Sequence, residues 1–165
     1  MNAPRAETAS AAMKVPACLV VLGGEPFAID VRHLREVMIV DKLTAVPGAP
    51  AFVRGVASLR GEILAILDVA PVLGLPPCGV GVPSKAFVLE PASRQVAIVV
   101  DEVLGLETFD ELRPPTDSLS NAYSAFERGR LERDGRLVPL LDIPKVVDEL
   151  KIRSRQAAAS RGTAT

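Results

Sequence analysis

Residues 58–69 read SLRGEILAILDV, and residues 134–143 echo this pattern as DGRLVPLLDI. In each stretch a glycine is followed by an apolar run that ends at an aspartate, Asp68 or Asp142. Short apolar runs between turn residues are typical of buried β-strands. Two such similar stretches, about 70 residues apart in the chain, predict two similar β-lobes.

The rest of the chain indicates further short strands separated by glycine and proline, and therefore an all-β fold. Residues 19–31 and 87–100 share a strand–turn–strand pattern with a similar offset. A lobe of roughly 70 residues has a thin core of its own, so we expect the two lobes to pack over a shared apolar surface. Strands are predicted over residues 17–22, 27–31, 52–58, 62–69, 85–89, 96–100, 125–132 and 136–143, a helix or turn over 33–38, and a short C-terminal helix over 145–153.

Composition limits the kinds of partner. Of the 165 residues, 48% are hydrophobic, but only five are Phe and one is Tyr, with no Trp. The formal net charge is −1. Nucleic-acid-binding surfaces normally show a basic excess and stacking aromatic side chains. The sequence therefore disfavours a nucleic-acid partner.

The two ends of the chain predict tails around one folded unit. We expect residues 1–14 and 151–165 to be flexible and residues 15–150 to contain both lobes. No apolar run is long enough for a transmembrane helix, and the first residues lack the apolar stretch of a signal peptide. A cytoplasmic protein that does not insert into the membrane is expected.

Residues that could carry chemistry form no recognisable catalytic or metal-binding motif. Cys18, Cys78 and the single His33 lack zinc-binding spacing, which indicates two free thiols. Aspartates at strand ends can converge as acid–base pairs or metal ligands, but they also end strands by accepting hydrogen bonds from backbone amides. We expect the second role and no cofactor, with a small β-barrel enzyme or metal protein as the alternative. The aspartates concerned are Asp30, Asp68, Asp101 and Asp142.

A binding module fits the sequence better than an enzyme does. Charged residues within apolar surroundings are the informative ones, because apolar residues are explained by core packing alone. Glu36 lies between Arg35 and Val37, and Arg60 lies between Leu59 and Gly61. If the two segments meet, the carboxylate and the guanidinium could form a bidentate pair.

The ordered set of motifs resembles the CheW-type chemotaxis coupling proteins. The most specific part is P-x-x-P-x-F-V-R-G-V-x-x-L-R-G-x-I-L-x-I-L-D at residues 47–68, and the resemblance extends over roughly residues 15–150. It implies two five-stranded SH3-like β-barrels packed side by side, and no catalysis. It also implies an adaptor that couples the cytoplasmic tip of a chemoreceptor to the regulatory domain of the histidine kinase CheA, within a two-component signalling array.

The same resemblance implies a receptor groove between the barrels. Glu36 and Arg60 would form an acid–base pair beside it, and Gly55 would leave room for the close approach of the receptor helices. Ser58 and Ala65 depart from the residues usual in the family, Asn and Pro. These departures leave open which receptor and kinase the protein serves. The alternative function is a divergent scaffold of a motility or other chemosensory pathway that binds receptor but not kinase. The receptor-binding residues implied are Leu34, Glu36, Val37, Gly55, Leu59, Arg60 and Gly61.

Overall fold

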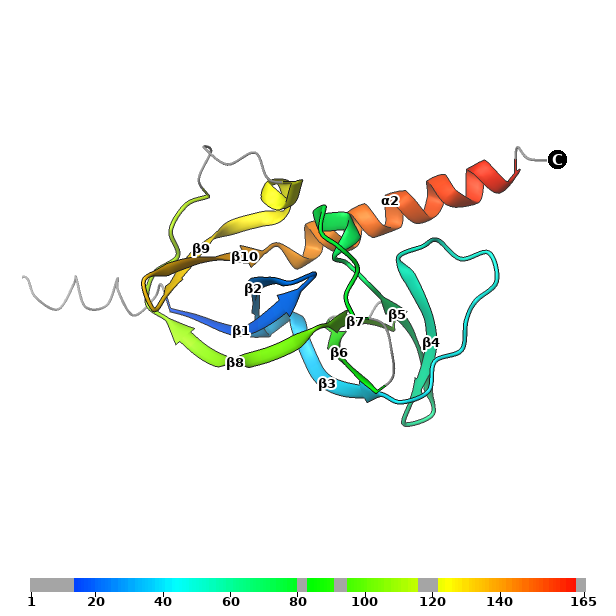
Figure 1. Cartoon of the computed structure of the whole chain (residues 1–165), viewed down its shortest axis with the longest axis horizontal. Coiled ribbons are helices and arrows are strands. Elements are labelled where there is room, and N and C mark those ends of the chain that lie inside the picture. Colours follow the sequence, from blue (N-terminus) through cyan, green and yellow to red (C-terminus); the bar gives the residue numbers. More distant parts are fainter. Residues whose placement is uncertain (1–13, 80–82, 91–94, 116–121, 163–165) are drawn as a thin grey trace, which may run out of the picture.

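The computed structural model describes residues 14–79, 83–90, 95–115 and 122–162. Within these ranges, ten strands form two five-stranded sheets, and a long helix follows the last strand (Figure 1). The two-lobed all-β architecture expected from the sequence is therefore confirmed. The tail expected over residues 1–14 lies outside the described residues except for Lys14, which is exposed and has no regular structure.

The first barrel has the spatial order β8-β1-β2-β10-β9. The β1–β2 hairpin pairs from Leu22 with Glu25 to Ala17 with Asp30, around a turn at Gly23 and Gly24. Its interior strands are apolar at consecutive positions because both faces are covered. The strands are β1 (Val15–Leu22), β2 (Glu25–Asp30), β8 (Glu102–Phe109), β9 (Glu127–Arg133) and β10 (Arg136–Leu141).

The second barrel has the spatial order β3-β6-β7-β5-β4. Its strands are consecutive in the chain, in contrast to those of the first barrel. Of three short 3-10 turns, η1 precedes β3, η2 lies between β5 and β6, and η3 precedes β9. The elements are β3 (Leu34–Val40), β4 (Val53–Leu59), β5 (Glu62–Leu67), β6 (Ser84–Leu89), β7 (Val96–Val100), η1 (Val31–His33), η2 (Pro71–Leu73) and η3 (Ala122–Phe126).

The two barrels are not the two halves of the sequence. The β1–β2 hairpin joins β8, β9 and β10, while β6 and β7 join β3, β4 and β5. Each exchange is made by a parallel pair, β2 with β10 at Ala28 and Leu140, and β5 with β7 from Ala65 with Val96 onward. The internal repeat correctly predicted matching strands in both lobes, but each lobe combines strands from both repeats.

A close backbone contact closes each barrel next to a glycine. Thr44, beyond the end of β3, pairs with Val56 of β4, and Arg113, beyond β8, pairs with Arg130 of β9. A Cβ atom on Gly55 would lie 2.5 Å from the Thr44 carbonyl oxygen. On Gly129, likewise, it would lie 2.5 Å from the carbonyl oxygen of Arg113. Only a residue without a side chain lets these strand ends meet.

One apolar core extends through both barrels. Its largest cluster includes Phe27 and Ile29 of β2 together with Leu64, Ile66 and Phe87 of the second barrel. A smaller cluster fills the first barrel around Leu19, Leu131 and Leu140. The shared core agrees with the apolar interface expected between two thin lobes.

Two strands were missed by the sequence patterns. Residues 34–38 were predicted to be helical or turn-like but belong to β3, after η1 has ended at His33. β8 was not predicted, because none of its residues before Phe109 is buried and they form no continuous apolar run. Both strands are defined by pairing, β3 with β6 and β8 with β1, rather than by a continuous apolar run.

The C-terminal helix is longer than predicted. α2 covers Ile143–Gly162, so residues 151–162, which were expected to belong to a flexible tail, are helical. Pro144 occupies the first turn, where its missing amide hydrogen is tolerated. The helix packs on the core through Val146 and Leu150, while positions 155 and 156 and 158–160 are exposed. In Figure 1 this end of α2 extends past the barrels.

Replacing Gly55 with alanine tests the barrel closure. The added Cβ would collide with Thr44, and the φ of +149° is unfavourable for an L-residue, so we expect a loss of about 2–4 kcal/mol in unfolding free energy. Gly24→Ala is the control, because Gly24 also has a positive φ of 86° but no atom within 4 Å. It should lose only about 1 kcal/mol. Urea unfolding followed by circular dichroism measures both losses. If the two variants lost the same unfolding free energy, the proposed collision with Thr44 would be contradicted.

The two buried thiols provide a test of the shared core. Burial raises the pKa of Cys18, and it raises the pKa of Cys78 to about 12, so both thiols stay protonated and inert at pH 8. We expect Ellman's reagent to label neither in the folded protein. Cys18→Ala leaves Cys78 as the thiol that reports on the second barrel, and Cys78→Ala leaves Cys18 as the thiol that reports on the first. In each variant the remaining thiol should react at the urea concentration at which that variant unfolds as a whole. If one thiol were labelled at a urea concentration well below the unfolding midpoint of its variant, the two barrels would unfold as separate units.

Candidate functional site

Arg60 occupies a strained position in the β4–β5 turn. Arg60 has φ 51° and Gly61 has φ 83°, which match the values of 51° and 76° at Asp134 and Gly135 in the β9–β10 turn. Two-residue hairpins with both φ angles positive favour Asn, Asp or Gly at the first position. An arginine there has no such preference and costs roughly 1–2 kcal/mol.

The strained arginine forms a bidentate ion pair with β3. Its two terminal nitrogens lie 2.6 and 3.3 Å from the Glu36 carboxylate oxygens. The Arg60 side chain remains 72% exposed, whereas that of Glu36 is 20% exposed. An ion pair this exposed contributes about 0–1 kcal/mol to stability. The contact therefore fixes the direction of the guanidinium more than it stabilises the fold.

Arg35 and Glu62 extend the pair into a row of alternating charges. Arg35 Nε lies 3.6 Å from Glu36, and an Arg35 terminal nitrogen lies 3.5 Å from Glu62. The β3–β6 register shifts between Leu34 and Glu36, so Arg35 is the extra residue of a bulge. Bulges redirect side chains locally, and here Arg35 and Glu36 can contact each other although they are neighbours on a strand. No pattern in the sequence indicated this bulge.

Apolar side chains are exposed beside the charged row. Val37 and Ile39 are 49% and 65% exposed on the outer face of β3, and Ile63 of β5 is also exposed. Large apolar side chains that share one exposed face often mark a contact with a partner. We call Arg35, Glu36, Val37, Ile39 and Arg60 the β3 surface.

The seven residues proposed from the sequence divide into two groups. Glu36, Val37 and Arg60 are accessible and belong to the β3 surface, and Gly61 completes the turn that presents Arg60. Leu34 and Leu59 are partly buried and pack against the core. Gly55 is buried under the chain's own Thr44, so the space beside it is already filled. Barrel closure is therefore a reason for this glycine within the chain itself, and the close approach by a receptor stays a prediction.

The strand-end aspartates hold the backbone of neighbouring loops. Asp68 accepts hydrogen bonds from the amides of Ala70 and Cys78. Asp101 accepts from the amides of Gly24 and Gly79, and Asp142 from the amide of Lys145 at the start of α2. These contacts match the structural role expected for the aspartates. Across the described ranges, no group of three or more His, Cys, Asp or Glu side chains is arranged to hold a metal ion.

Asp30 is buried and paired with Arg32. Burial raises the pKa of the Asp30 carboxyl, but hydrogen bonds from the Arg32 guanidinium and amide outweigh this effect and leave the pKa below its ordinary value. The carboxylate is held at 2.6 Å by an Arg32 terminal nitrogen and has Arg128 at 3.8 Å. It is therefore fixed in its charged form, which suits an anchoring role better than proton transfer.

The sequence patterns missed a second, more buried pair. An Arg54 terminal nitrogen lies 2.7 Å from Asp68 and 2.6 Å from the Cys78 carbonyl oxygen, and so ties the η2 loop to β4. A longer repeat marks both residues, although the equivalent Arg128 lies near Asp30 and no ion pair joins it to Asp142 among the described residues. Residues 52–68 and 126–142 align without a gap and share Phe52 with Phe126, Arg54 with Arg128, Gly55 with Gly129, Gly61 with Gly135, Leu67 with Leu141 and Asp68 with Asp142.

Comparisons with known proteins give matches over most of the chain. The family model described as CheW-like domain matches residues 16–151. The chemotaxis protein CheW of Rhizobium meliloti (strain 1021) is 32% identical over 127 residues, which are 76% of this chain and 82% of that protein. The chemotaxis protein CheW of Thermotoga maritima is 30% identical over 129 residues, which are 78% of this chain and 85% of that protein.

A solved structure shares the fold. The crystal structure of the scaffolding protein TtCheW from Thermoanaerobacter tengcongensis matches with a TM-score of 0.67 and 24% identity, over 78% of this chain and 89% of that one. No helix among the described residues is long and apolar enough to cross a membrane. With the family model covering nearly all of the two barrels and α2 as far as Lys151, this chain belongs to the CheW-like domain family.

Proposed function

We propose that this chain is a non-enzymatic adaptor that couples the cytoplasmic tip of a chemoreceptor to the regulatory domain of a CheA-type histidine kinase. The relatives named as chemotaxis proteins support a role in chemotaxis-type signalling. The observation that carries the site assignment is the Glu36–Arg60 pair on a strained, exposed turn. The adaptor would work in the cytoplasm, at receptor arrays that it reaches through its partners.

The magnitudes argue that Arg60 serves recognition rather than stability. The left-handed conformation costs roughly 1–2 kcal/mol for an arginine, and the exposed ion pair returns about 0–1 kcal/mol. An Asp–Gly turn of the same geometry is used by the same chain at Asp134. A residue that costs more than it contributes to folding is best explained by a contact with a partner.

The β3 surface suits the end of a helical hairpin. A helix presents apolar side chains on one face and polar groups on its flanks, and a groove with the same arrangement accepts it. Val37 and Ile39 supply apolar area, while Arg60 and Arg35 supply directed guanidinium groups beside it. We assign this surface to the receptor.

The kinase contact is assigned to the first barrel. Among the described residues of that barrel, the large apolar side chains left exposed are Leu104 and Leu106 of β8 and Leu137 of β10. Leu106 is 70% exposed. A regulatory domain built from similar barrels would cover these side chains without competing for the Glu36–Arg60 pair.

Arg60→Asn should separate recognition from folding. Asparagine keeps the positive φ of the turn but removes the guanidinium, so stability should stay the same or rise by up to about 1 kcal/mol. Binding to a receptor cytoplasmic fragment should weaken at least about tenfold, because the directed charge is lost. Isothermal titration calorimetry and thermal unfolding measure the two effects. Asp134→Asn, in the matching turn of the other barrel, is the control and should leave binding unchanged.

Leu106→Asp should act on the other partner. A carboxylate in an apolar contact is desolvated without a partner, so affinity for the kinase regulatory domain should fall about tenfold or more. Receptor binding should remain. Pull-down with each partner separately gives the readout. If the unaltered protein binds receptor but not the kinase domain at tens of micromolar, the receptor-only scaffold is the correct function.

A further inference from the structure

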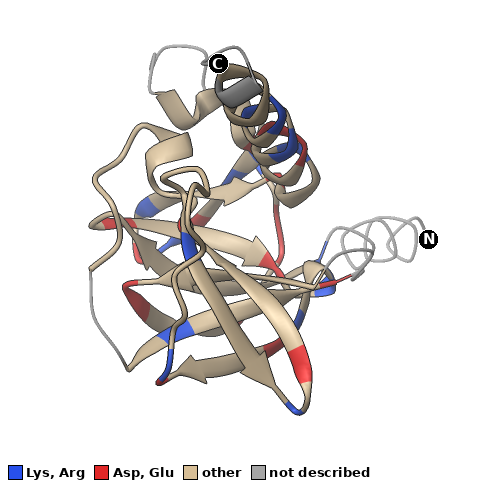
Figure 2. Cartoon of the chain, turned by 90° about the vertical axis from the view of Figure 1, so that its right-hand side faces the viewer, with Lys and Arg blue, Asp and Glu red and all other residues tan. Residues whose placement is uncertain are grey.

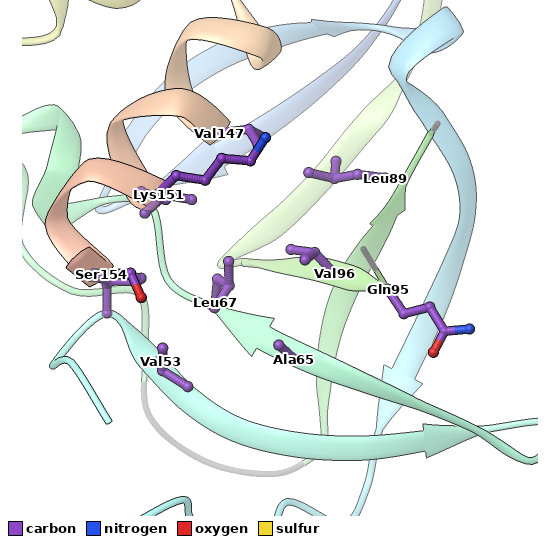
Figure 3. A pocket seen from close by; sticks show the side chains of 11 residues that line it. Val53, Ala65, Leu67, Leu89, Gln95, Val96, Val147, Lys151 and Ser154 are labelled. Carbon is purple, nitrogen blue, oxygen red and sulfur yellow. The ribbon is translucent and has the colours of Figure 1, made fainter. Parts of the chain in front are cut away.

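A cavity of about 280 Å³ lies between α2 and the second barrel, and its lining shares no residue with the β3 surface. Figure 3 shows the helix on one side and strands β4, β5 and β7 on the other. In Figure 2, α2 lies above the barrel strands. The cavity is lined by Phe52, Val53, Ala65, Leu67, Leu89, Gln95, Val96, Val147, Leu150, Lys151 and Ser154.

The helix side of the cavity is one face of α2. Val147, Leu150, Lys151 and Ser154 follow the i, i+3, i+4, i+7 spacing that places side chains on one stripe. Ser154 lies beyond residue 153, where the predicted C-terminal helix ended. The helical turn that continues past this point therefore completes the wall.

A small residue makes the room on the strand side. Ala65 of β5 occupies the position that Pro139 holds in the repeat of the first barrel. Its amide donates a hydrogen bond of 3.0 Å to the Gln95 carbonyl oxygen, which a proline could not do. Ala65 therefore allows the hydrogen bond between β5 and the residue before β7, and its small side chain leaves the cavity open.

The lining has a defined polarity. Leu67, Leu89 and Leu150 are members of the main core that end at this cavity. Lys151 is the one charged residue in the lining, and no carboxylate of a described residue lies within 4.0 Å of its ammonium group. Figure 3 shows its side chain running along the helix side of the cavity toward Val147. An apolar space with a single unpaired cation at its wall suits a ligand with an apolar body and one negative charge.

We propose that this cavity binds a small amphipathic carboxylate, with its hydrocarbon body between α2 and β5 and its carboxylate on Lys151. The volume is nearly twice the roughly 150 Å³ that holds one benzene molecule, which corresponds to a body of about eight carbons. The ligand contacts both α2 and the barrel and so stabilises the packed position of the helix by mass action. The site is separate from the receptor and kinase surfaces.

Octanoate is the probe, with octan-1-ol as the uncharged counterpart. We expect a titration followed by 15N-HSQC NMR to shift amides of β5, β7 and the 147–154 segment together. Lys151→Met keeps the apolar stem and should weaken octanoate about two- to fivefold, the size of one exposed ion pair, with octanol unchanged. Lys145→Met is the control, because Lys145 is exposed on α2 and does not line the cavity. It should change neither affinity.

A second pair of variants tests the location. Ala65→Leu should fill the cavity and abolish binding of both probes, and Ser154→Phe should do the same from an exposed position where folding is not at risk. The proposal is wrong if octanoate shifts no cavity amides, or if these variants bind it normally. Equal affinity of the parent and Lys151→Met for octanoate would also overturn it, since the space would then take any apolar group without preference for an anion.

Discussion

The parallel pairing of β2 with β10, at Ala28 and Leu140, is the contact on which the rest of the molecule depends. It inserts the first hairpin of the chain between strands from the far end, and β5 with β7 completes the reciprocal exchange. Neither barrel can then form from one repeat. This arrangement explains why a single apolar cluster includes Phe27 of one barrel and Phe87 of the other. It also places the two proposed binding surfaces on barrels that share one core.

Comparing equivalent positions of the two repeats distinguishes residues that both barrels require from residues that only one barrel has. The amides of Asp68 and Asp142 donate equivalent hydrogen bonds to the carbonyl oxygens of Phe52 and Phe126, at 2.8 and 2.7 Å. Gly55 and Gly129 admit equivalent backbone contacts. These positions are shared because both barrels must close in the same way. The β4–β5 and β9–β10 turns have the same backbone conformation but different first residues, Arg60 and Asp134. The backbone geometry of the turn therefore does not explain why an arginine is present at position 60.

The sequence predicted the interior well and the surface poorly, for a physical reason. Strands buried on both faces, such as β1 and β7, leave an uninterrupted apolar run. β3 and β8 expose one side, and their partners are distant in the chain, so no local pattern defines them. Glu36 and Arg60 were correctly expected to pair if their segments met. The bulge at Arg35 and the covering of Gly55 by Thr44 depend on register and close approach, which apolar periodicity does not encode.

The exchanged hairpin has a consequence for synthesis of the protein. β1 and β2 leave the ribosome first, but β10, their parallel neighbour, follows about 110 residues later, a delay of roughly 5–20 s at ordinary rates of translation. The second barrel, whose five strands are consecutive, can close during that interval. Until the last strand emerges, the face of the hairpin that carries Leu19 and Ala28 has no barrel to enter. During that interval the nascent chain therefore carries a hairpin with one apolar face that β10 does not yet cover.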